Sequence, residues 1–336
     1  MTHLETQALI AIRRGTAHSR ADLARCLNVS RPTASTVVSG LLSGGLIEET
    51  GRGVSSGGKA PTLLAVCGSG MYFIGVDLGY SDRISAVLTD LRGRILRHTE
   101  QRFIPSTSME TTEKVAELAS ELTSELPDGT VLHGAAVALS GIVEWNTGRV
   151  LRSINPAFVG DSLRRELEVR LNLPVLVENR ARMAAVSEAF GGIAEGEENF
   201  ALISLGKSIG SAFHLNRELY AGHHSMSGEL RQIRLSNGMT MEEAMSPAEV
   251  GAADPEKTLQ CCAEGLGQFL SILDLDLLVL SGRFADFGAS FPLRLENELK
   301  KNDFDCRIRA ARFGRFSAAR GSAFRLGELQ IIKNQM

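Results

Sequence analysis

Hydrophobic and polar positions at the start of the chain repeat with the period of a helix. Apolar Leu4, Ala8 and Ile12 share one face, and Gly15 closes the segment, so the pattern predicts an amphipathic helix over residues 4–14. Such a helix must cover its apolar face against other elements. The pattern therefore predicts a small helical core at this end of the chain.

Two further helices are predicted a short distance along the chain. Ser19 is placed to cap a second helix and Ser30 a third, in which Pro32 occupies the first turn. About four residues separate these two helices. This spacing is typical of a helix-turn-helix.

The third predicted helix has two contrasting sides. Its apolar stripe consists of Ala34, Val37, Val38, Leu41 and Leu42. Its opposite side carries the short residues Pro32, Thr33, Thr36, Ser39 and Ser43. Such a surface, almost free of negative charge, can approach phosphates and base edges closely, and Arg31 at the helix N-terminus is placed for a phosphate or a guanine.

Two short strands, at residues 46–49 and 59–66, follow around a Gly- and Ser-rich tip and predict a wing. Arg52 and Lys59 flank the tip and can reach the DNA backbone or a minor groove. We therefore predict a winged helix-turn-helix over residues 1–67, the head. The predicted DNA-binding residues are Ser30, Arg31, Pro32, Thr33, Ser35, Thr36, Ser39, Arg52 and Lys59. The alternative is a helical module for protein contacts.

From residue 71 the pattern changes to strands alternating with helices. A first series has strands at residues 73–79, 85–89, 95–103, 134–139 and 174–177, with helices at 110–126 and 162–171. A second series has strands at residues 200–205, 211–215 and 277–280, with a helix at 256–273 and a turn at 281–282. Each α/β half has a glycine turn after a strand, which predicts a nucleotide or sugar cleft between two lobes.

Composition agrees with a globular, cytoplasmic protein of two or three domains. The 336 residues are 43% hydrophobic and 22% charged, and the longest apolar stretches fall far short of the roughly 20 residues that span a membrane. The N-terminus lacks a signal-peptide layout. The five cysteines include no CxxC pair, so neither a disulfide framework nor a cysteine zinc site is predicted, and Cys261 and Cys262 are interpreted as buried small hydrophobes.

Charge is unevenly distributed along the chain. The head holds seven basic and four acidic residues, a surplus of three positive charges, while the whole chain has a net charge of -3. The remainder therefore carries about six negative charges. A mildly basic head on an acidic body favours nucleic acid as the partner of the head.

The order of these motifs resembles the ROK family of repressors and sugar kinases over almost the whole chain. The resemblance rests on the head, on an Asp-x-Gly strand end at Asp77, on a Glu-Asn helix start at Glu178, and on Ser-Gly-Glu-Leu at residues 227–230. It implies a sugar kinase-like body over residues 71–336 with the two-lobed actin and hexokinase (ribonuclease H-like) fold. Kinase members phosphorylate sugars with ATP, and repressor members are dimers that bind operator DNA and sense sugars or partner proteins.

The chain departs from the family at its catalytic motifs. The family segment Glu-Asn-Asp-Ala-Asn is here Glu-Asn-Arg-Ala-Arg, and Arg180 stays protonated, so it cannot act as a base. In the first phosphate turn Tyr80 replaces a glycine, and in the second Ser208 does. No catalytic residue and no cofactor are therefore predicted.

The zinc motif is also absent. The family's Glu-x-Gly-His is here Glu-Leu-Arg-Gln, beginning at Glu229, and residues 233–244 contain no cysteine, so no metal is predicted. His223 and His224 are interpreted as surface residues. The polar residues that the resemblance places near a sugar are Asn155, Glu178, Asn179 and Glu229. Asn155 precedes a proline and is equally typical of a turn.

Together these observations predict a DNA-binding transcriptional regulator, a repressor by resemblance, with a catalytically inactive sugar kinase-like body. The expected partners are double-stranded operator DNA with an inverted repeat, a second copy in a homodimer or dimer of dimers, and a sugar or sugar phosphate, with no membrane partner. Two alternatives stay open. One is a sugar kinase with an appended DNA-binding domain, and the other is a regulator with no sugar ligand.

Overall fold

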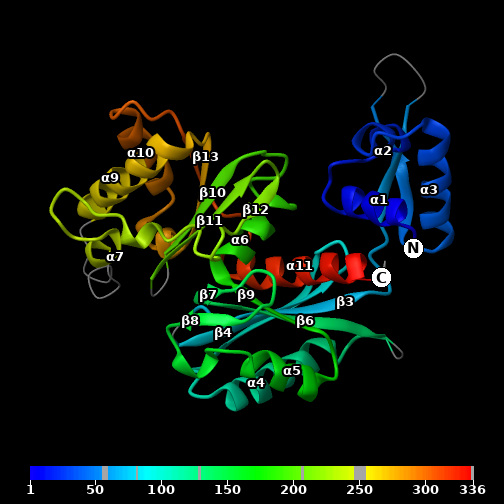
Figure 1. The fold of residues 1–336 in the computed structure, drawn as a ribbon, viewed down its shortest axis with the longest axis horizontal. Helices are drawn as coiled ribbons and strands as arrows, with labels where there is room; N and C mark the ends of the chain where they lie inside the picture. Colours follow the sequence, from blue (N-terminus) through cyan, green and yellow to red (C-terminus); the bar gives the residue numbers. More distant parts are fainter. Residues whose placement is uncertain (55–59, 81, 128–129, 206–207, 246–254, 334–336) are drawn as a thin grey trace.

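The computed structural model describes most of the chain (Figure 1). The described ranges are residues 1–54, 60–80, 82–127, 130–205, 208–245 and 255–333. Three parts are visible: a small N-terminal part, a lower lobe and an upper lobe, which we call the head, lobe 1 and lobe 2. Among the helices of the described ranges, none is long and apolar enough to cross a membrane.

The head consists of three capped helices and a two-stranded sheet. The helices are α1 (His3–Arg13), α2 (Arg20–Cys26) and α3 (Arg31–Ser43), close to the predicted ranges. Side chains of Thr2, Ser19 and Ser30 cap these helices by accepting hydrogen bonds from backbone N–H groups of the first turn. Strands β1 (Ile47–Arg52) and β2 (Thr62–Val66) pair antiparallel, with Arg52 opposite Thr62. Helix α3 buries its apolar stripe against α1 and α2.

The two lobes repeat one sheet topology. The lobe 1 sheet has the order β5-β4-β3-β6-β9 and the lobe 2 sheet the order β12-β11-β10-β13-β14. In each, the first three strands are antiparallel and the last three are parallel. The lobe 1 strands are β3 (Tyr72–Asp77), β4 (Arg83–Asp90), β5 (Ile95–Arg102), β6 (Leu132–Leu139) and β9 (Val175–Asn179). The lobe 2 strands are β10 (Phe200–Leu205), β11 (Ile209–Leu215), β12 (Glu218–Tyr220), β13 (Leu277–Gly282) and β14 (Arg307–Ala310).

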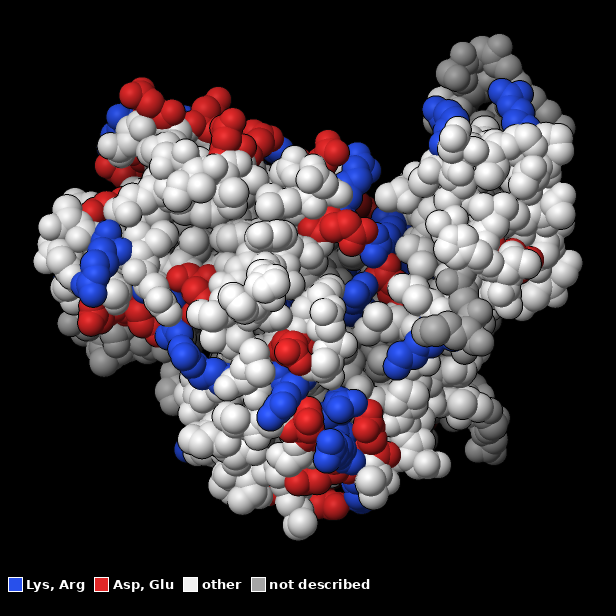
Figure 2. All heavy atoms as spheres, viewed as in Figure 1, with Lys and Arg blue, Asp and Glu red and all other residues white. Residues whose placement is uncertain are grey.

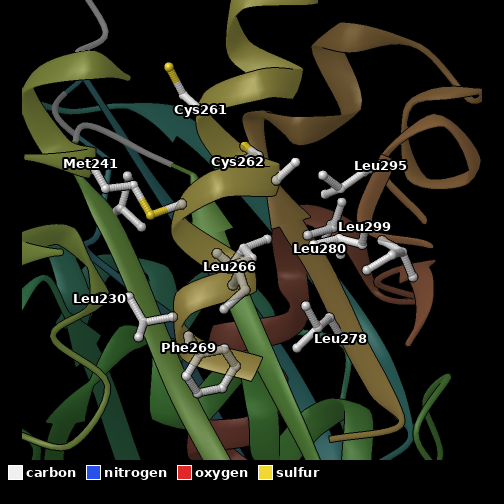
Figure 3. Close-up of a cluster of buried hydrophobic side chains, with 14 of the residues drawn as sticks. Leu230, Met241, Cys261, Cys262, Leu266, Phe269, Leu278, Leu280, Leu295 and Leu299 are labelled. Atoms are coloured by element: carbon white, nitrogen blue, oxygen red, sulfur yellow. The ribbon is translucent and has the colours of Figure 1, made fainter. Parts of the chain in front are cut away.

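Helices cover the outer face of each sheet. Helices α4 (Ser108–Thr123) and α5 (Ser162–Leu171) cover lobe 1, and α9 (Pro255–Leu273) and α10 (Phe291–Lys300) cover lobe 2. Figure 3 shows the lobe 2 core, where apolar side chains of α9, α10 and β13 interdigitate. Cys261 and Cys262 are buried at its edge, as the sequence predicts. The predicted turn at 281–282 is instead the end of β13, and the helix predicted over 110–126 ends at Thr123.

Shorter elements connect these layers. They are the hairpin strands β7 (Gly141–Val143) and β8 (Val150–Ser153), helix α7 (Met241–Ala244), and the 3₁₀ turns η1 (Pro156–Phe158), η2 (Leu230–Gln232), η3 (Arg283–Phe287) and η4 (Gly314–Phe316).

Two buried helices fill the space between the sheets. Helix α6 (Arg180–Ala189) packs on β10 and β11 of lobe 2, and α11 (Ser317–Lys333) packs on β3 and β6 of lobe 1 and against α6. Figure 1 shows α11, in red, lying between the lobes. A Cβ at Gly321 of α11 would lie 1.7 Å from the Met183 carbonyl oxygen of α6. Glycine therefore sets the close approach of the two helices.

The head is docked on the body through two arginines, the buried Arg13 and the half-buried Arg14. Arg13 of α1 donates to the Leu91 carbonyl of lobe 1 (2.6 Å) and to the Phe324 carbonyl of α11 (2.8 Å). Arg14 contacts Glu328 of α11 and Glu218 of β12, each at 2.5 Å. The apolar core of the head also continues into the body. Arg13 at the end of α1 and Arg14, its C-cap, thus together contact both lobes and the helix between them.

Candidate functional site

The outer side of α3 is exposed and lightly charged. Arg31, Pro32, Thr33, Thr36 and Ser39 are all exposed. Ser30 caps the helix, and its Oγ lies 2.7 Å from the hydroxyl of Thr33. Short polar groups therefore form a surface that a DNA groove or phosphate can contact closely.

The remaining predicted DNA contacts differ in placement. Arg31 is exposed, and no described residue gives it a hydrogen bond or ion pair. Arg52 is exposed at the end of β1. Ser35 is half-buried, so it is less accessible than its neighbours. Lys59 lies outside the described residues.

The charge distribution differs between the head and lobe 2. Figure 2 shows Lys and Arg side chains beside the tip of the head and few acidic groups on that face of it. On lobe 2, Asp and Glu side chains gather along the edge near α10. This separation gives the head the sign of charge that a nucleic acid attracts.

A cavity of about 160 Å³ lies between the two lobes. Its lining comes from the segment after β6, from β8, from the first turn of α6, from the end of β10 with the start of β11, and from η2. Both sheets thus reach it with strand ends, which is the usual place for a ligand in α/β proteins.

Two of the predicted sugar contacts line this cavity. Asn179 caps α6: its Oδ1 accepts from the Arg182 amide (3.0 Å) and its Nδ2 donates to the Gly141 carbonyl (2.7 Å). Glu229 accepts from the Arg231 guanidinium at 2.6 Å. Both side chains therefore lie beside the cavity in fixed positions.

The other two predicted sugar contacts, Glu178 and Asn155, do not line it. Glu178 is buried and its Oε1 lies 2.5 Å from Arg182, so its carboxylate is engaged inside the protein. Burial raises the pKa of Glu178, and Arg182 counteracts part of this effect. Asn155 caps η1 and donates to the Pro105 carbonyl (2.9 Å). Its amide therefore stabilises a turn, which was one of the two roles that the sequence allowed for it. Asn155 lines a neighbouring hollow of about 240 Å³ instead.

Arg180, in the slot of the family's base, bridges the lobes. Its Nε lies 2.9 Å from Asp77 Oδ2 at the end of β3, and its Nη1 lies 3.0 Å from Ser204 Oγ near the end of β10. Its guanidinium lies 4.3 Å from the centroid of the Tyr80 ring. The side chain therefore lies between the end of β3 and the end of β10.

The space beside Gly79 is also filled by Arg180. A Cβ at Gly79 would lie 1.8 Å from Arg180 Cδ. In this arrangement the Asp77 carboxylate is paired with a cation, and Tyr80 covers the guanidinium. The carboxylate and the guanidinium therefore occupy each other inside the protein.

Metal ligands are not gathered anywhere in the described ranges. No group of three or more His, Cys, Asp or Glu residues there could hold an ion. His223 and His224 are exposed, as the sequence predicts.

Two arginines that were not predicted as ligand contacts line the cavity. Arg231 follows Glu229 by two positions on η2, and Arg152 lies on β8. One signal in the sequence pointed to Arg231, because this residue occupies the glycine position of the family's Glu-x-Gly-His motif. Nothing in the sequence pattern marks Arg152, because the short β8 hairpin brings it to the cavity.

A family model described as "ROK family" matches residues 73–244 of the chain. The xylose repressor of Bacillus subtilis (strain 168) is 28% identical over 219 residues, which are 65% of this chain and 56% of the repressor. The chain thus spans little more than half the length of this curated relative.

Two solved structures are similar in fold. A ROK family transcriptional regulator, described as a homologue of the E. coli MLC protein, has a TM-score of 0.74 at 18% identity and covers 98% of this chain and 96% of its own. A ROK family glucokinase from Streptomyces griseus, in complex with glucose and AMPPNP, has a TM-score of 0.62 at 19% identity, covering 75% of this chain and 98% of its own. These likenesses confirm the predicted mixed α/β, hexokinase-like body.

Proposed function

The chain belongs to the ROK family, and we propose that it is a transcriptional repressor whose kinase-like body senses a ligand and does not phosphorylate it. The observation that carries the proposal is the outer side of α3, which is exposed and hydroxylated and begins with Arg31, a residue without an ion pair to any described residue. Binding to operator DNA would place the protein in the cytoplasm.

In this proposal the head is a winged helix-turn-helix. Helices α2 and α3 form the helix-turn-helix, and β1 with β2 forms the wing. Helix α3 enters the major groove, where Arg31 contacts a phosphate or a guanine, and Arg52 contacts the backbone. Two copies in a symmetric dimer would present two such helices, so the operator is an inverted repeat.

The body lacks the means to transfer phosphate. Arg180 lies where the family has its base, and it is held there by Asp77 and Ser204. Tyr80 adds a bulky ring where the family has a glycine in the first phosphate turn. The first replacement removes the group that would accept the proton, and the second fills space where a phosphate would approach the backbone. A kinase needs both functions together.

Sensing would reach the head through α1. Arg14 contacts Glu218 of lobe 2 and Glu328 of α11, and Arg13 contacts Leu91 of lobe 1. A ligand that changes the angle between the lobes would move these anchors relative to each other. The head position, and hence operator affinity, would then depend on occupancy of the cavity.

The relatives support a carbohydrate-linked role. The Bacillus subtilis relative is named a xylose repressor, and the Streptomyces griseus kinase was solved with glucose. We extend to this chain only the class of ligand, a small hydroxylated molecule. The four serines and the asparagine that line the cavity provide hydrogen-bonding partners for such hydroxyl groups.

The proposal is tested by a gel shift on the DNA upstream of the protein's own gene at two salt concentrations. We expect a specific complex that weakens with salt, and a loss of specific binding in the triple variant Arg31→Ala, Thr33→Ala, Thr36→Ala. The matched control is Arg165→Ala, an exposed arginine on α5. Undiminished binding by the triple variant would contradict the assignment of α3.

The absence of kinase activity is tested by ³²P transfer from ATP to a panel of hexoses and amino sugars. We expect no turnover. Turnover that disappears in the Asn179→Ala variant would overturn the non-enzymatic reading and favour a kinase with an appended DNA-binding head.

A further inference from the structure

The interlobe cavity is lined by more positive than negative side chains. Arg152, Arg180 and Arg231 face one carboxylate, Glu229, on its lining. Asp77 lies behind Arg180 and is the only other acidic partner that the described residues give these three arginines. One positive charge is therefore left over in the site.

The surplus charge lies on Arg152. Arg180 is satisfied by Asp77 and Ser204, and Arg231 by Glu229. Arg152 has no hydrogen bond or ion pair from its guanidinium to any described residue, and its side chain is exposed. A guanidinium carries five N–H donors in a planar fork that matches a carboxylate or phosphate.

The hydroxyl groups around the cavity are arranged as acceptors. Ser140 Oγ donates to the Gly79 carbonyl and Ser153 Oγ donates to the Ser140 carbonyl. With its hydrogen directed at the backbone, Ser140 Oγ keeps its lone pairs for hydroxyl donors of a ligand, and Ser153 Oγ, which also accepts from the backbone amide of Asn155, keeps one. The lining thus combines acceptors for hydroxyl groups with the Arg152 guanidinium, which has no hydrogen bond or ion pair to a described residue.

Two of the three arginines occupy positions where the resembled family has other residues. Arg180 stands at its Asp and Arg231 at its Gly. Both changes add positive charge to the cavity. A neutral sugar would leave the Arg152 donors to water alone, whereas an anionic group would pair with them.

We propose that the effector of this protein is a hydroxylated small anion, a sugar bearing a carboxylate or a phosphate, bound in the interlobe cavity with Arg152 and Arg231 beside its anionic group. The inference rests on the proposed sensing function. A guanidinium recognises a carboxylate and a phosphate in the same way. The experiment therefore includes both sugar acids and a sugar phosphate, to distinguish the two kinds of anion.

The test is thermal shift and calorimetry on the full chain at fixed ionic strength. The probes are glucuronate and galacturonate, glucose 6-phosphate, neutral glucose and xylose, and inorganic phosphate and acetate. We expect stabilisation by the uronates or by the sugar phosphate and none by the neutral sugars. The responding probe identifies the source of the anion.

The variant Arg152→Ala removes this cation without breaking a side-chain hydrogen bond or ion pair to any described residue. We expect affinity for the responding probe to fall about 10- to 100-fold, the range for losing hydrogen bonds to a charged group. Arg149→Ala, an exposed arginine of the same β7–β8 hairpin that does not line the cavity, is the control and should retain affinity. Retained affinity in Arg152→Ala would overturn the inference.

Three other outcomes would also overturn it. They are equal stabilisation by neutral sugars, the same stabilisation by inorganic phosphate or acetate, and no stabilisation by any probe. Operator binding is measured separately by gel shift. A failure of this inference with intact, α3-dependent DNA binding therefore leaves the DNA-binding function standing, and only the identity or existence of the effector is lost.

Discussion

Arg180 and Asp77 form a buried ion pair with 2.9 Å between Nε and Oδ2, although 103 residues separate them in the chain. The pair joins the first residue of α6 to the last residue of β3. The pair therefore fixes the start of α6 to the end of β3, beside the interlobe cavity.

Removing one partner of this pair should be costly. In Arg180→Ala the fully buried Asp77 carboxylate loses its cation, and we expect the free energy of unfolding to fall by about 3–5 kcal/mol. Urea denaturation measures the loss. The control is Arg315→Ala, whose ion pair with Glu100 is exposed and should be worth less than about 1 kcal/mol. Equal losses in the two variants would mean that Arg180 is not structural.

Arg14 should hold the head against the body. In Arg14→Ala, Glu328 keeps Arg325 at 3.0 Å but loses a 2.5 Å contact, so we expect docking to weaken by about 2 kcal/mol. Amide hydrogen exchange should become faster in α1 and stay unchanged in α9. Arg25→Ala, which removes an exposed ion pair with Asp22 in the same head, should leave α1 unchanged. Unaltered exchange of α1 in Arg14→Ala would contradict the docking role.

His214 should make stability depend on pH. Burial, together with Arg14 and Arg217, lowers the pKa of His214 from 6.5 to about 4. The unfolded chain therefore binds a proton first as pH falls, so stability is complete above pH 6.5 and declines from there towards pH 4. At pH 5.0 the loss from this group is about 2 kcal/mol relative to pH 7.5.

The variant His214→Phe should remove that loss. The ring stacks on Phe200 with 4.9 Å between centroids, so a phenyl group preserves the contact. Urea denaturation at pH 7.5 and 5.0 should show a smaller pH-dependent difference than in the wild type. The exposed His224→Gln variant is the control and should keep the wild-type difference. An unchanged difference in His214→Phe would contradict this assignment.

The contact between α6 and α11 should not tolerate a methyl group. In Gly321→Ala the Cβ would meet the Met183 carbonyl, so the helices must separate, and we expect a loss of about 3 kcal/mol or more. Gly44→Ala is the control, because Gly44 has φ -78° and a nearest neighbour at 3.4 Å. That variant should be neutral or slightly stabilising. Thermal unfolding separates the two, and similar transitions would contradict the close approach.

Local patterns in the sequence predicted the strands and amphipathic helices well. Helices α2 and α3 begin after Ser19 and Ser30 caps that are readable from residue type alone, and each strand that was predicted lies within a few residues of an observed one. The short strands β12 and β14 and helix α10 were not predicted. Helix α11 went unpredicted because Ala319, Ser322, Phe324 and Glu328 are buried on different sides of it. A helix that is buried all round has no apolar stripe to mark it.

The site was predicted only in part, because side-chain direction depends on distant partners. Of the four predicted sugar contacts, Asn179 and Glu229 line the cavity, whereas Glu178 is directed to Arg182 and Asn155 to Pro105. The sequence singled out Arg180 by its residue type alone. The pairing of Arg180 with Asp77 could not be inferred from the residues that flank either one in the sequence, because the two lie far apart along the chain.

The position of α11 has a consequence for biosynthesis. The ribosome makes the head first, yet two of its anchors, the Phe324 carbonyl and Glu328, belong to the last helix that the structure describes. While α11 is still inside the exit tunnel, α1 lacks the α11 residues that it docks on, and the two sheets lack the helix that packs between them. A nascent head therefore stays undocked, with part of its apolar core uncovered, until α11 has left the exit tunnel.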